Sequence, residues 1–152
     1  MTEHAELIAC YELTQAKAKY CRTLDTRDWS ALAALMTPDI EFGMTDGQSE
    51  PHMTVGRDET LALLQSLVAG ARTAHQVHTP EIELNDDEAS VIWTVQDRAV
   101  FDNGMSVTGY GHYTERWVRR EGAWRLASLR LSHLLTDVRQ DHSGSGLPTP
   151  AC

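Results

Sequence analysis

One carboxylate interrupts the apolar face of a predicted strand in the second half of the chain. Apolar residues alternate along the segment 88–101, and Asp97 falls on the face that also carries Trp93 and Val95. A carboxylate within an apolar layer costs free energy unless it is paired or faces a wet cavity. Asp97 is therefore a candidate for acid–base chemistry, with a solvated strand end as the alternative.

Strand pairing is predicted to bring a histidine to this carboxylate. The apolar faces of two consecutive strands match when Leu84 opposes Ala89 across the turn between them. Pro80 cannot donate a ladder hydrogen bond, which predicts a bulge there and a register shifted by one residue beyond it. His75 then lies opposite Asp97, roughly 5 Å away. An adjacent carboxylate makes an imidazole more basic and can fix its tautomer.

A second acid–base candidate lies at the end of the first predicted helix. Tyr20 and Asp25 are about 140° apart on a continuous helix, so they can share a cavity only if the helix ends near Leu24. The polar segment 26–28 that follows predicts such an end. The alternative is that Asp25 only caps the helix and that Tyr20 packs in the core.

The remaining histidines give weaker signals. His112 lies on a predicted strand between two tyrosines and is a candidate pocket residue, whereas His133 stands in a terminal or loop context and is expected to be solvated. His75 and His78 could bind zinc together with a carboxylate, but the H-x-x-H spacing on a strand favours no metal site. The chain has no Gly-rich phosphate loop, no GxSxG elbow and no GxGxxG motif, so we expect no nucleotide cofactor and no serine-hydrolase chemistry.

The elements that must position these residues fall into a helical half and a sheet half. Three helices are predicted, over 3–24, 28–36 and 58–69, with a short strand at 40–44. Four strands are predicted to follow as an antiparallel meander, over 73–84, 88–101, 106–120 and 123–135. The sheet must bury one face under the helices, which predicts an α+β layer structure with a strongly curved sheet.

Composition limits the classes of partner. The 152 residues fit one domain, and the net charge of −9 argues against a nucleic-acid or anionic-membrane surface. No run is long and apolar enough for a membrane span, and the N-terminus does not resemble a signal peptide. Three cysteines without a CxxC pair indicate neither a disulfide framework nor a zinc knuckle, so we expect a cytoplasmic protein. The Ser-, Gly- and Pro-rich segment 141–152 is expected to be a flexible tail.

Five short blocks stand in a distinctive order and spacing: 20–29 (YCRTLDTRDW), 37–39 (TPD), 55–57 (VGR), 75–80 (HQVHTP) and 122–125 (GAWR). Together they resemble the SnoaL-like branch of the nuclear-transport-factor-2-like (NTF2-like) superfamily, and most closely its scytalone dehydratase-like subgroup. The likeness extends over most of the chain. It implies a cone-shaped α+β barrel, in which three helices pack on a curved antiparallel sheet around a deep pocket.

The resemblance also assigns roles to residues. In related dehydratases and dehydrochlorinases, a histidine after the third helix pairs with an aspartate after the first, and these positions match His75 and Asp25. Bile-acid dehydratase-like members carry a tyrosine and a second aspartate that match Tyr20 and Asp97. Dehydrochlorinases have a lysine in place of this tyrosine, so Tyr20 argues against dehalogenation. Relatives commonly form dimers or trimers, which implies a homo-oligomer here.

From these residues and this resemblance we expect a cofactor-free lyase, a dehydratase of a small cyclic or polyketide-like molecule. His75 would be the general base, Asp25 its orienting partner and Tyr20 the donor to an enolate oxygen. Asp97 would assist protonation of the leaving group or hold His75 in place. The expected substrate-binding residues are Trp93, Val95, Phe42, Met44 and His112. The alternatives are an aldol-type polyketide cyclase, a ketosteroid-type isomerase and a non-catalytic ligand-binding protein.

Overall fold

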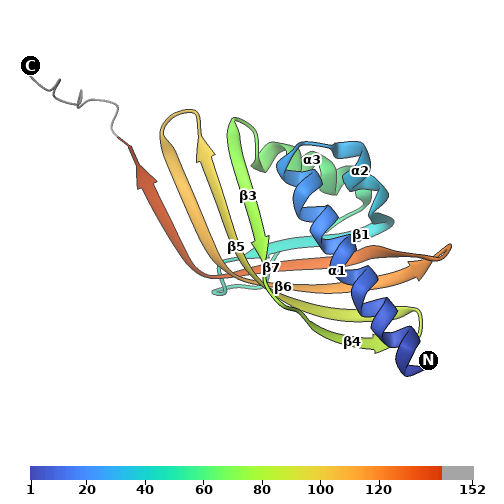
Figure 1. The fold of residues 1–152 in the computed structure, drawn as a ribbon. Helices are drawn as coiled ribbons and strands as arrows, with labels where there is room; N and C mark the ends of the chain where they lie inside the picture. The colour runs from blue at the N-terminus through green and yellow to red at the C-terminus, as the bar shows by residue number, and fades with distance from the viewer. Residues whose placement is uncertain (142–152) are drawn as a thin grey trace, which may run out of the picture.

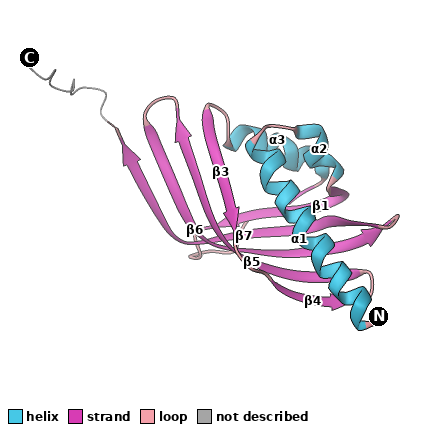
Figure 2. Ribbon diagram, in the orientation of Figure 1, coloured by secondary structure: helices cyan, strands magenta, loops and turns pink. Residues whose placement is uncertain are grey.

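The computed structural model describes residues 1–141. Three helices cover one face of a long, bent sheet, and the longest of them lies across the strands on that face (Figures 1 and 2). The helices are α1 (Glu3–Asp25), α2 (Trp29–Ala34) and α3 (Arg57–Leu67). The strands are β1 (Met36–Thr45), β2 (Thr54–Val55), β3 (Ala71–Val77), β4 (Glu81–Asn85), β5 (Glu88–Phe101), β6 (Met105–Arg120) and β7 (Ala123–Gln140).

The sheet is mixed, not purely antiparallel as expected from the sequence. Its strand order is β2-β1-β7-β6-β5-β3, with β4 also paired to β5. All pairs are antiparallel except β1 and β7, which run parallel. Parallel neighbours need a long crossover, and the whole chain from β2 to β6 supplies it between these two strands. Strand β1 thus occupies the edge of β7, the last strand of the meander.

The interruption predicted at Pro80 is present. The predicted single strand over 73–84 is two strands, β3 and β4, that pair with different parts of β5. Leu84 lies opposite Ala89 before the interruption. His75 lies opposite Asp97 beyond it, as the shifted register predicts.

Helix α1 buries apolar residues of its C-terminal half, while some near its start stay exposed. Thr2 caps it by accepting a hydrogen bond from the amide of Ala5, and the helix continues to Asp25. The side chains of Leu7 and Tyr11 are exposed, although they stand at helical spacing with the buried Cys21 and Leu24. The helix turns the face that carries Leu13 toward the sheet, because its buried residues follow a spacing of three and four. The buried residues are Ala9, Leu13, Lys17, Tyr20, Cys21, Thr23 and Leu24.

The first and last strands are longer than predicted. Strand β1 begins at Met36 instead of residue 40, and β7 continues to Gln140 instead of ending at 135. The expected flexible tail, apart from Asp141, lies outside the described residues. None of the three described helices combines the length and apolar character needed to cross a membrane.

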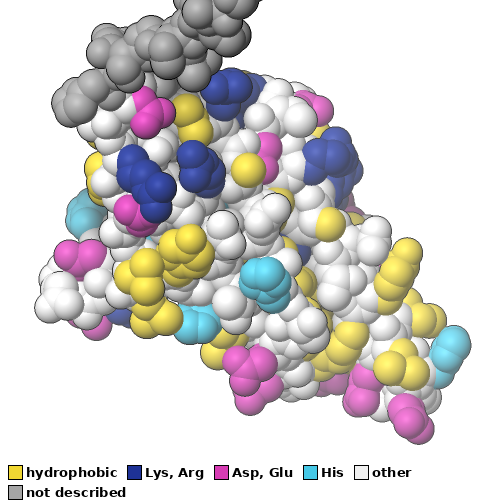
Figure 3. Space-filling model, turned by 60° about the vertical axis from the view of Figure 1, so that its left-hand side comes forward, with side chains coloured by type: hydrophobic (Ala, Val, Ile, Leu, Met, Phe, Trp, Pro, Cys, Tyr) yellow, Lys and Arg dark blue, Asp and Glu magenta, His cyan; other side chains and the backbone are white. Residues whose placement is uncertain are grey.

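Hydrophobic side chains also remain on the surface. On the face seen in Figure 3 they form separate patches, with Lys and Arg side chains gathered in the upper part of the view. Leu134, Leu135 and Val138 near the end of β7 are among the exposed ones.

Candidate active site

A cavity of about 210 Å³ opens between the helices and the concave face of the sheet. Most of its wall is apolar, including Leu24, Phe42, Met44, Leu64, Phe101 and Leu131. Its polar lining comes from four elements, α1, β3, β5 and the β6–β7 hairpin. The polar residues of the lining are Tyr20, Thr73, His75, Asp97, Arg98, Tyr113 and His133. An apolar hollow with a few convergent polar groups is typical of a small-molecule site.

His75 and Asp25 form one hydrogen-bonded pair at this cavity. Nδ1 of His75 lies 2.6 Å from Oδ1 of Asp25, and the backbone amide of His75 donates to Oδ2 at 2.9 Å. The carboxylate therefore holds His75 at two points and leaves Nε2 as the ring nitrogen available to the cavity. Burial alone would raise the pKa of Asp25, but the hydrogen bonds from His75 outweigh it and hold the pKa below its usual value.

Two further side chains hold Asp25 in place. The Thr73 hydroxyl donates to Oδ1 of Asp25 at 2.9 Å and accepts from the Arg27 guanidinium at 2.9 Å. The same guanidinium donates to the carbonyl oxygens of Leu24 and Ala71, which ties the end of α1 to the start of β3. Arg27 has φ of 61°, an uncommon left-handed conformation for a non-glycine residue, and it ends the helix directly after Asp25. Helix α1 therefore ends at Asp25, one residue beyond Leu24, near which it must end if Tyr20 and Asp25 are to share a cavity.

A second His–Asp pair lines the same cavity. Nε2 of His133, on β7, lies 2.7 Å from Oδ2 of Asp97, on β5. Each of the two side chains is 17% exposed. Asp97 thus reaches across β6 to His133, although its strand register places it directly opposite His75. The hydrogen bond that His133 donates to Asp97 raises the pKa of His133 above its ordinary value, against the opposing effect of burial.

The partner of Asp97 differs from the expectation. His133 is expected to be solvated near the end of the predicted strand 123–135, whereas β7 continues to Gln140 and His133 lines the cavity. A signal was present in the sequence: Leu129, Leu131 and His133 follow each other at the spacing of one strand face. Leu129 and Leu131 are buried, and His133 continues their face into the cavity.

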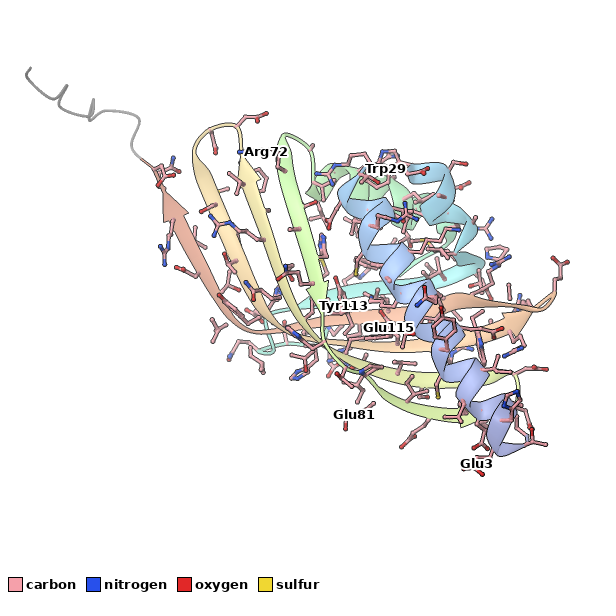
Figure 4. The ribbon with its side chains drawn as sticks, viewed as in Figure 1. Glu3, Trp29, Arg72, Glu81, Tyr113 and Glu115 are labelled. Atoms are coloured by element: carbon pink, nitrogen blue, oxygen red, sulfur yellow. The ribbon has the colours of Figure 1, made fainter. Side chains whose placement is uncertain are left out.

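Two tyrosines complete the polar lining. The rings of Tyr20 and Tyr113 meet edge to face with centroids 6.4 Å apart. Burial raises the pKa of both phenols well above the ordinary value of 10.0, so both remain protonated hydrogen-bond donors at neutral pH. Tyr113 extends from β6 toward α1 (Figure 4).

A buried ion pair lies behind these rings. Lys17 and Glu115, both fully buried, are in contact between α1 and β6. The ammonium group stands 3.6 Å from the ring centroid of Tyr113 and 4.2 Å from that of Tyr20. The other carboxylate oxygen of Glu115 accepts from the indole nitrogens of Trp93 and Trp117. This network joins the helix to the sheet and fixes the two phenols.

The structure places the expected substrate-binding residues in two groups. Phe42 and Met44 line the cavity. Trp93, Val95 and His112 are absent from its lining, contrary to expectation. Trp93 is sealed into the core, where its indole bonds to Glu115, and Val95 is buried in the same core. His112 follows the alternation of β6 to the face opposite that of Tyr113.

The residues 1–141 contain no group of three or more His, Cys, Asp or Glu side chains arranged to hold a metal ion. His78, the partner in the hypothetical zinc site, is exposed and lies three residues along from His75. The acid–base groups at the cavity are the imidazoles of His75 and His133, each bonded to one carboxylate, and the phenols of Tyr20 and Tyr113.

The fold and this cavity define a class of protein. A family model described as a SnoaL-like domain matches residues 5–130, and the chain belongs to this family. Its three helices on a curved, mixed sheet are the NTF2-like fold.

Several known proteins are similar to this chain. Probable cyclase FGR4 of Gibberella zeae is 28% identical over 134 residues, which cover 80% of this chain and 89% of that protein. A scytalone dehydratase-like protein of Novosphingobium aromaticivorans has a TM-score of 0.81 at 21% identity, with 99% of each chain covered. The hexachlorocyclohexane dehydrochlorinase LinA-type3 of Novosphingobium barchaimii has a TM-score of 0.77 at 18% identity, with 98% of this chain and 100% of that one covered. At these identities the two solved structures are informative about the fold alone.

Proposed function

We propose that this protein is a cofactor-free lyase, a dehydratase that acts on a small cyclic or polyketide-like molecule. The observation that carries the proposal is the 2.6 Å contact between Oδ1 of Asp25 and Nδ1 of His75 inside an apolar cavity. It provides an oriented imidazole whose second nitrogen is available to a substrate. Such a group is a general base of the kind that removes a proton next to a carbonyl.

The proposed reaction begins with proton transfer. Nε2 of His75 takes a proton from the carbon α to a carbonyl, and Asp25 stabilises the imidazolium that forms. The Tyr20 hydroxyl donates a hydrogen bond to the oxygen that becomes an enolate, which its raised pKa supports because it remains protonated. Asp97 takes part through His133 and not by holding His75, because its carboxylate bonds to His133.

A second candidate function uses the same base, but its enolate reacts without loss of a leaving group. An aldol-type cyclase or a ketosteroid-type isomerase needs the same proton transfer but expels no water. The similarity to a protein named as a cyclase favours keeping this alternative. A third candidate, a non-catalytic ligand-binding protein, would use the cavity without proton transfer. For each of these candidate functions, the cavity volume of about 210 Å³ suits a small one- or two-ring molecule.

The test uses a small cyclic β-hydroxy ketone, 3-hydroxycyclohexanone, and measures its conversion to the enone by absorbance and by an 18 Da mass decrease. His75→Ala and Asp25→Asn should each abolish turnover, because the first removes the base and the second removes the carboxylate that orients it. The melting temperature and circular dichroism of each variant show that the loss does not come from unfolding. His78→Ala is the matched control, since His78 is an exposed histidine on the same segment. Its activity should equal that of the unmodified protein.

A second measurement tests proton removal by His75 separately from loss of the leaving group. Incubation of cyclohexanone in D₂O, followed by NMR, reports exchange of the α-protons without any leaving group. Exchange that depends on His75, without dehydration of the hydroxy ketone, would replace the dehydratase with the cyclase or isomerase alternative. Neither exchange nor dehydration, with these probes, or wild-type-like activity in His75→Ala, would defeat the proposal.

A further inference from the structure

The cavity holds a histidine on each side, and each histidine has its own carboxylate. His75 stands on β3 and His133 on β7, and the strand order places β5 and β6 between them. Three strand spacings put the two backbones about 14 Å apart along the sheet. Both side chains nevertheless line one cavity, so a small ring bound there has an imidazole at either end.

The His133–Asp97 pair is built into the sheet at a glycine. Strand β6 passes between the two side chains, and Gly109 on it lies directly opposite Asp97. A Cβ atom at this position would stand 2.7 Å from Oδ1 of Asp97 and would overlap the imidazole ring of His133. The pair can therefore form only because residue 109 has no side chain.

The strand β7 contributes a second local feature. The pairing of β6 with β7 shifts between Tyr110 and Gly111, so that Leu135 and His133 pair with consecutive residues and Leu134 is extra. Such a bulge bends a strand and can redirect a neighbouring side chain. It lies directly beside His133, on the side where β7 leaves the cavity.

We propose that His133, held by Asp97, is the catalytic acid that gives a proton to the hydroxyl group that leaves the substrate. This inference rests on the proposed dehydratase function and assigns the second half of its chemistry. Asp97 accepts from Nε2 of the imidazole, so the second proton of the protonated ring is the one on Nδ1, and this is the proton offered to the leaving oxygen. The hydrogen bond to Asp97 raises the pKa of His133, which favours the protonated form that can donate.

The proton count of the reaction balances. His75 accepts the α-proton, and the electrons of that C–H bond become the enolate and then the new C=C bond. The C–O bond to the β-carbon breaks with its electrons on oxygen, which takes the proton from His133 and leaves as water. His75 then carries one extra proton and His133 lacks one, and exchange with solvent restores both. No oxidant, reductant or cofactor enters.

This arrangement narrows the substrate class. The α-carbon must reach the His75 end while a hydroxyl group on the adjacent β-carbon reaches toward the His133 end, which a small cyclic β-hydroxy ketone does. The body of the ring meets apolar side chains such as Leu24, Phe42 and Leu131. We therefore expect neutral, compact rings to bind better than flexible or highly charged molecules.

The experiment compares two leaving groups in one assay. The substrates are 3-hydroxycyclohexanone, which must be protonated to lose water, and 3-acetoxycyclohexanone, which loses acetate as a stable anion. The variant His133→Gln keeps a side-chain N–H for Asp97 but cannot transfer a proton. It should lower kcat/KM for the hydroxy ketone by about 10²–10⁴-fold, the usual range for a general acid. For the acetoxy ketone the loss should be below about tenfold after subtraction of the uncatalysed rate.

The controls separate this inference from the proposed function. His75→Ala should abolish both eliminations, His78→Gln should change neither, and His133→Gln should retain α-proton exchange of cyclohexanone in D₂O. Equal losses of His133→Gln on both substrates, or no loss on either, would overturn the role of His133 while His75 remains the base. An unmodified protein that neither exchanges nor eliminates would remove the proposed function and this inference together. Melting temperatures and circular dichroism of the variants identify any loss that comes from misfolding.

Discussion

At the scale of single residues, the cavity depends on contacts that each fix one atom. Asp25 holds Nδ1 of His75, and Asp97 holds Nε2 of His133, so the two rings are held through opposite nitrogens. The ring nitrogen that remains free is Nε2 in His75 and Nδ1 in His133, so the two histidines would meet a bound molecule through different atoms. One missing Cβ atom, at Gly109, is what allows the second pair to form.

Gly109→Ala is predicted to reduce turnover strongly while lowering the stability of the fold only slightly. The added methyl group meets only the ends of the His133 and Asp97 side chains, which can rotate away without moving the backbone. The melting temperature should therefore fall by only a few degrees, the shift that about 1 kcal/mol produces in a domain of this size. Turnover of 3-hydroxycyclohexanone, measured by enone absorbance, should fall to the level of His133→Gln.

A collapse of the fold in Gly109→Ala would show that backbone packing, and not the pair, requires the glycine. Activity equal to that of the unmodified protein would show that the pair can be displaced without consequence. The double variant Gly109→Ala/His133→Gln should be no less active than either single variant, because both changes remove the same contact.

At the scale of elements, one buried ion pair joins the long helix to the sheet. Lys17 lies on the sheet-facing side of α1, and Glu115 lies between Tyr113 and Trp117 on the inward face of β6 (Figure 4). Replacement of one partner leaves the other charged and buried, which is far costlier than loss of the pair as a whole. The same pair sits against the rings of Tyr113 and Tyr20, so its loss also loosens the polar lining of the cavity.

Lys17→Met is predicted to reduce the free energy of unfolding by about 3–5 kcal/mol, because the Glu115 carboxylate stays buried without its cation. Urea unfolding followed by tryptophan fluorescence measures the change. Lys19→Met is the matched control, since Lys19 is exposed on the same helix and its loss should change stability by less than about 0.5 kcal/mol.

The double variant Lys17→Met/Glu115→Gln completes this comparison. It should be more stable than Lys17→Met alone, because it removes the uncompensated charge while the amide can still accept from an indole nitrogen. Equal stability of the single and double variants would contradict an electrostatic role for the pair.

At the scale of the whole molecule, stability should vary with pH through the two cavity pairs in opposite ways. The pKa of Asp25 is lowered in the fold, so its contribution is present above its ordinary value of 3.8 and is lost as the pH falls through the lower folded value. The pKa of His133 is raised, so its contribution is complete below the ordinary value of 6.5 and is lost as the pH rises through the higher folded value. Both contributions are present together between these values.

Thermal unfolding from pH 5 to pH 9 tests this prediction. The melting temperature of the unmodified protein should exceed that of His133→Gln most at the acid end of this range, and the difference should shrink as the pH rises above about 6.5 and His133 loses its proton. His78→Gln serves as the control and should show no such trend. A difference that stays constant or grows toward pH 9 would contradict a raised pKa in the fold.

Association of copies of the chain stays a prediction. The exposed side chains of Leu134, Leu135 and Val138 on β7 agree with the homo-oligomer that the family resemblance implies. Both His–Asp pairs of the cavity form within one chain.

Local patterns in the sequence were enough to predict the three helices, the strands of the meander and part of the cavity geometry. Alternating apolar residues and a proline set the register that puts His75 opposite Asp97, because hairpin pairing depends on residues close in the chain. The end of α1 near Asp25 could also be predicted, because local polar residues stop a helix. These are short-range effects, and they were predicted correctly.

The long-range partners of the charged groups could not be predicted from the sequence. Asp97 bonds to His133 across an intervening strand, Lys17 bonds to Glu115 from helix to sheet, and β1 runs parallel to β7. Each of these contacts joins residues far apart in the chain. Each depends on the curvature of the sheet and on where α1 crosses it, and neither quantity is encoded in the spacing of residues along one element.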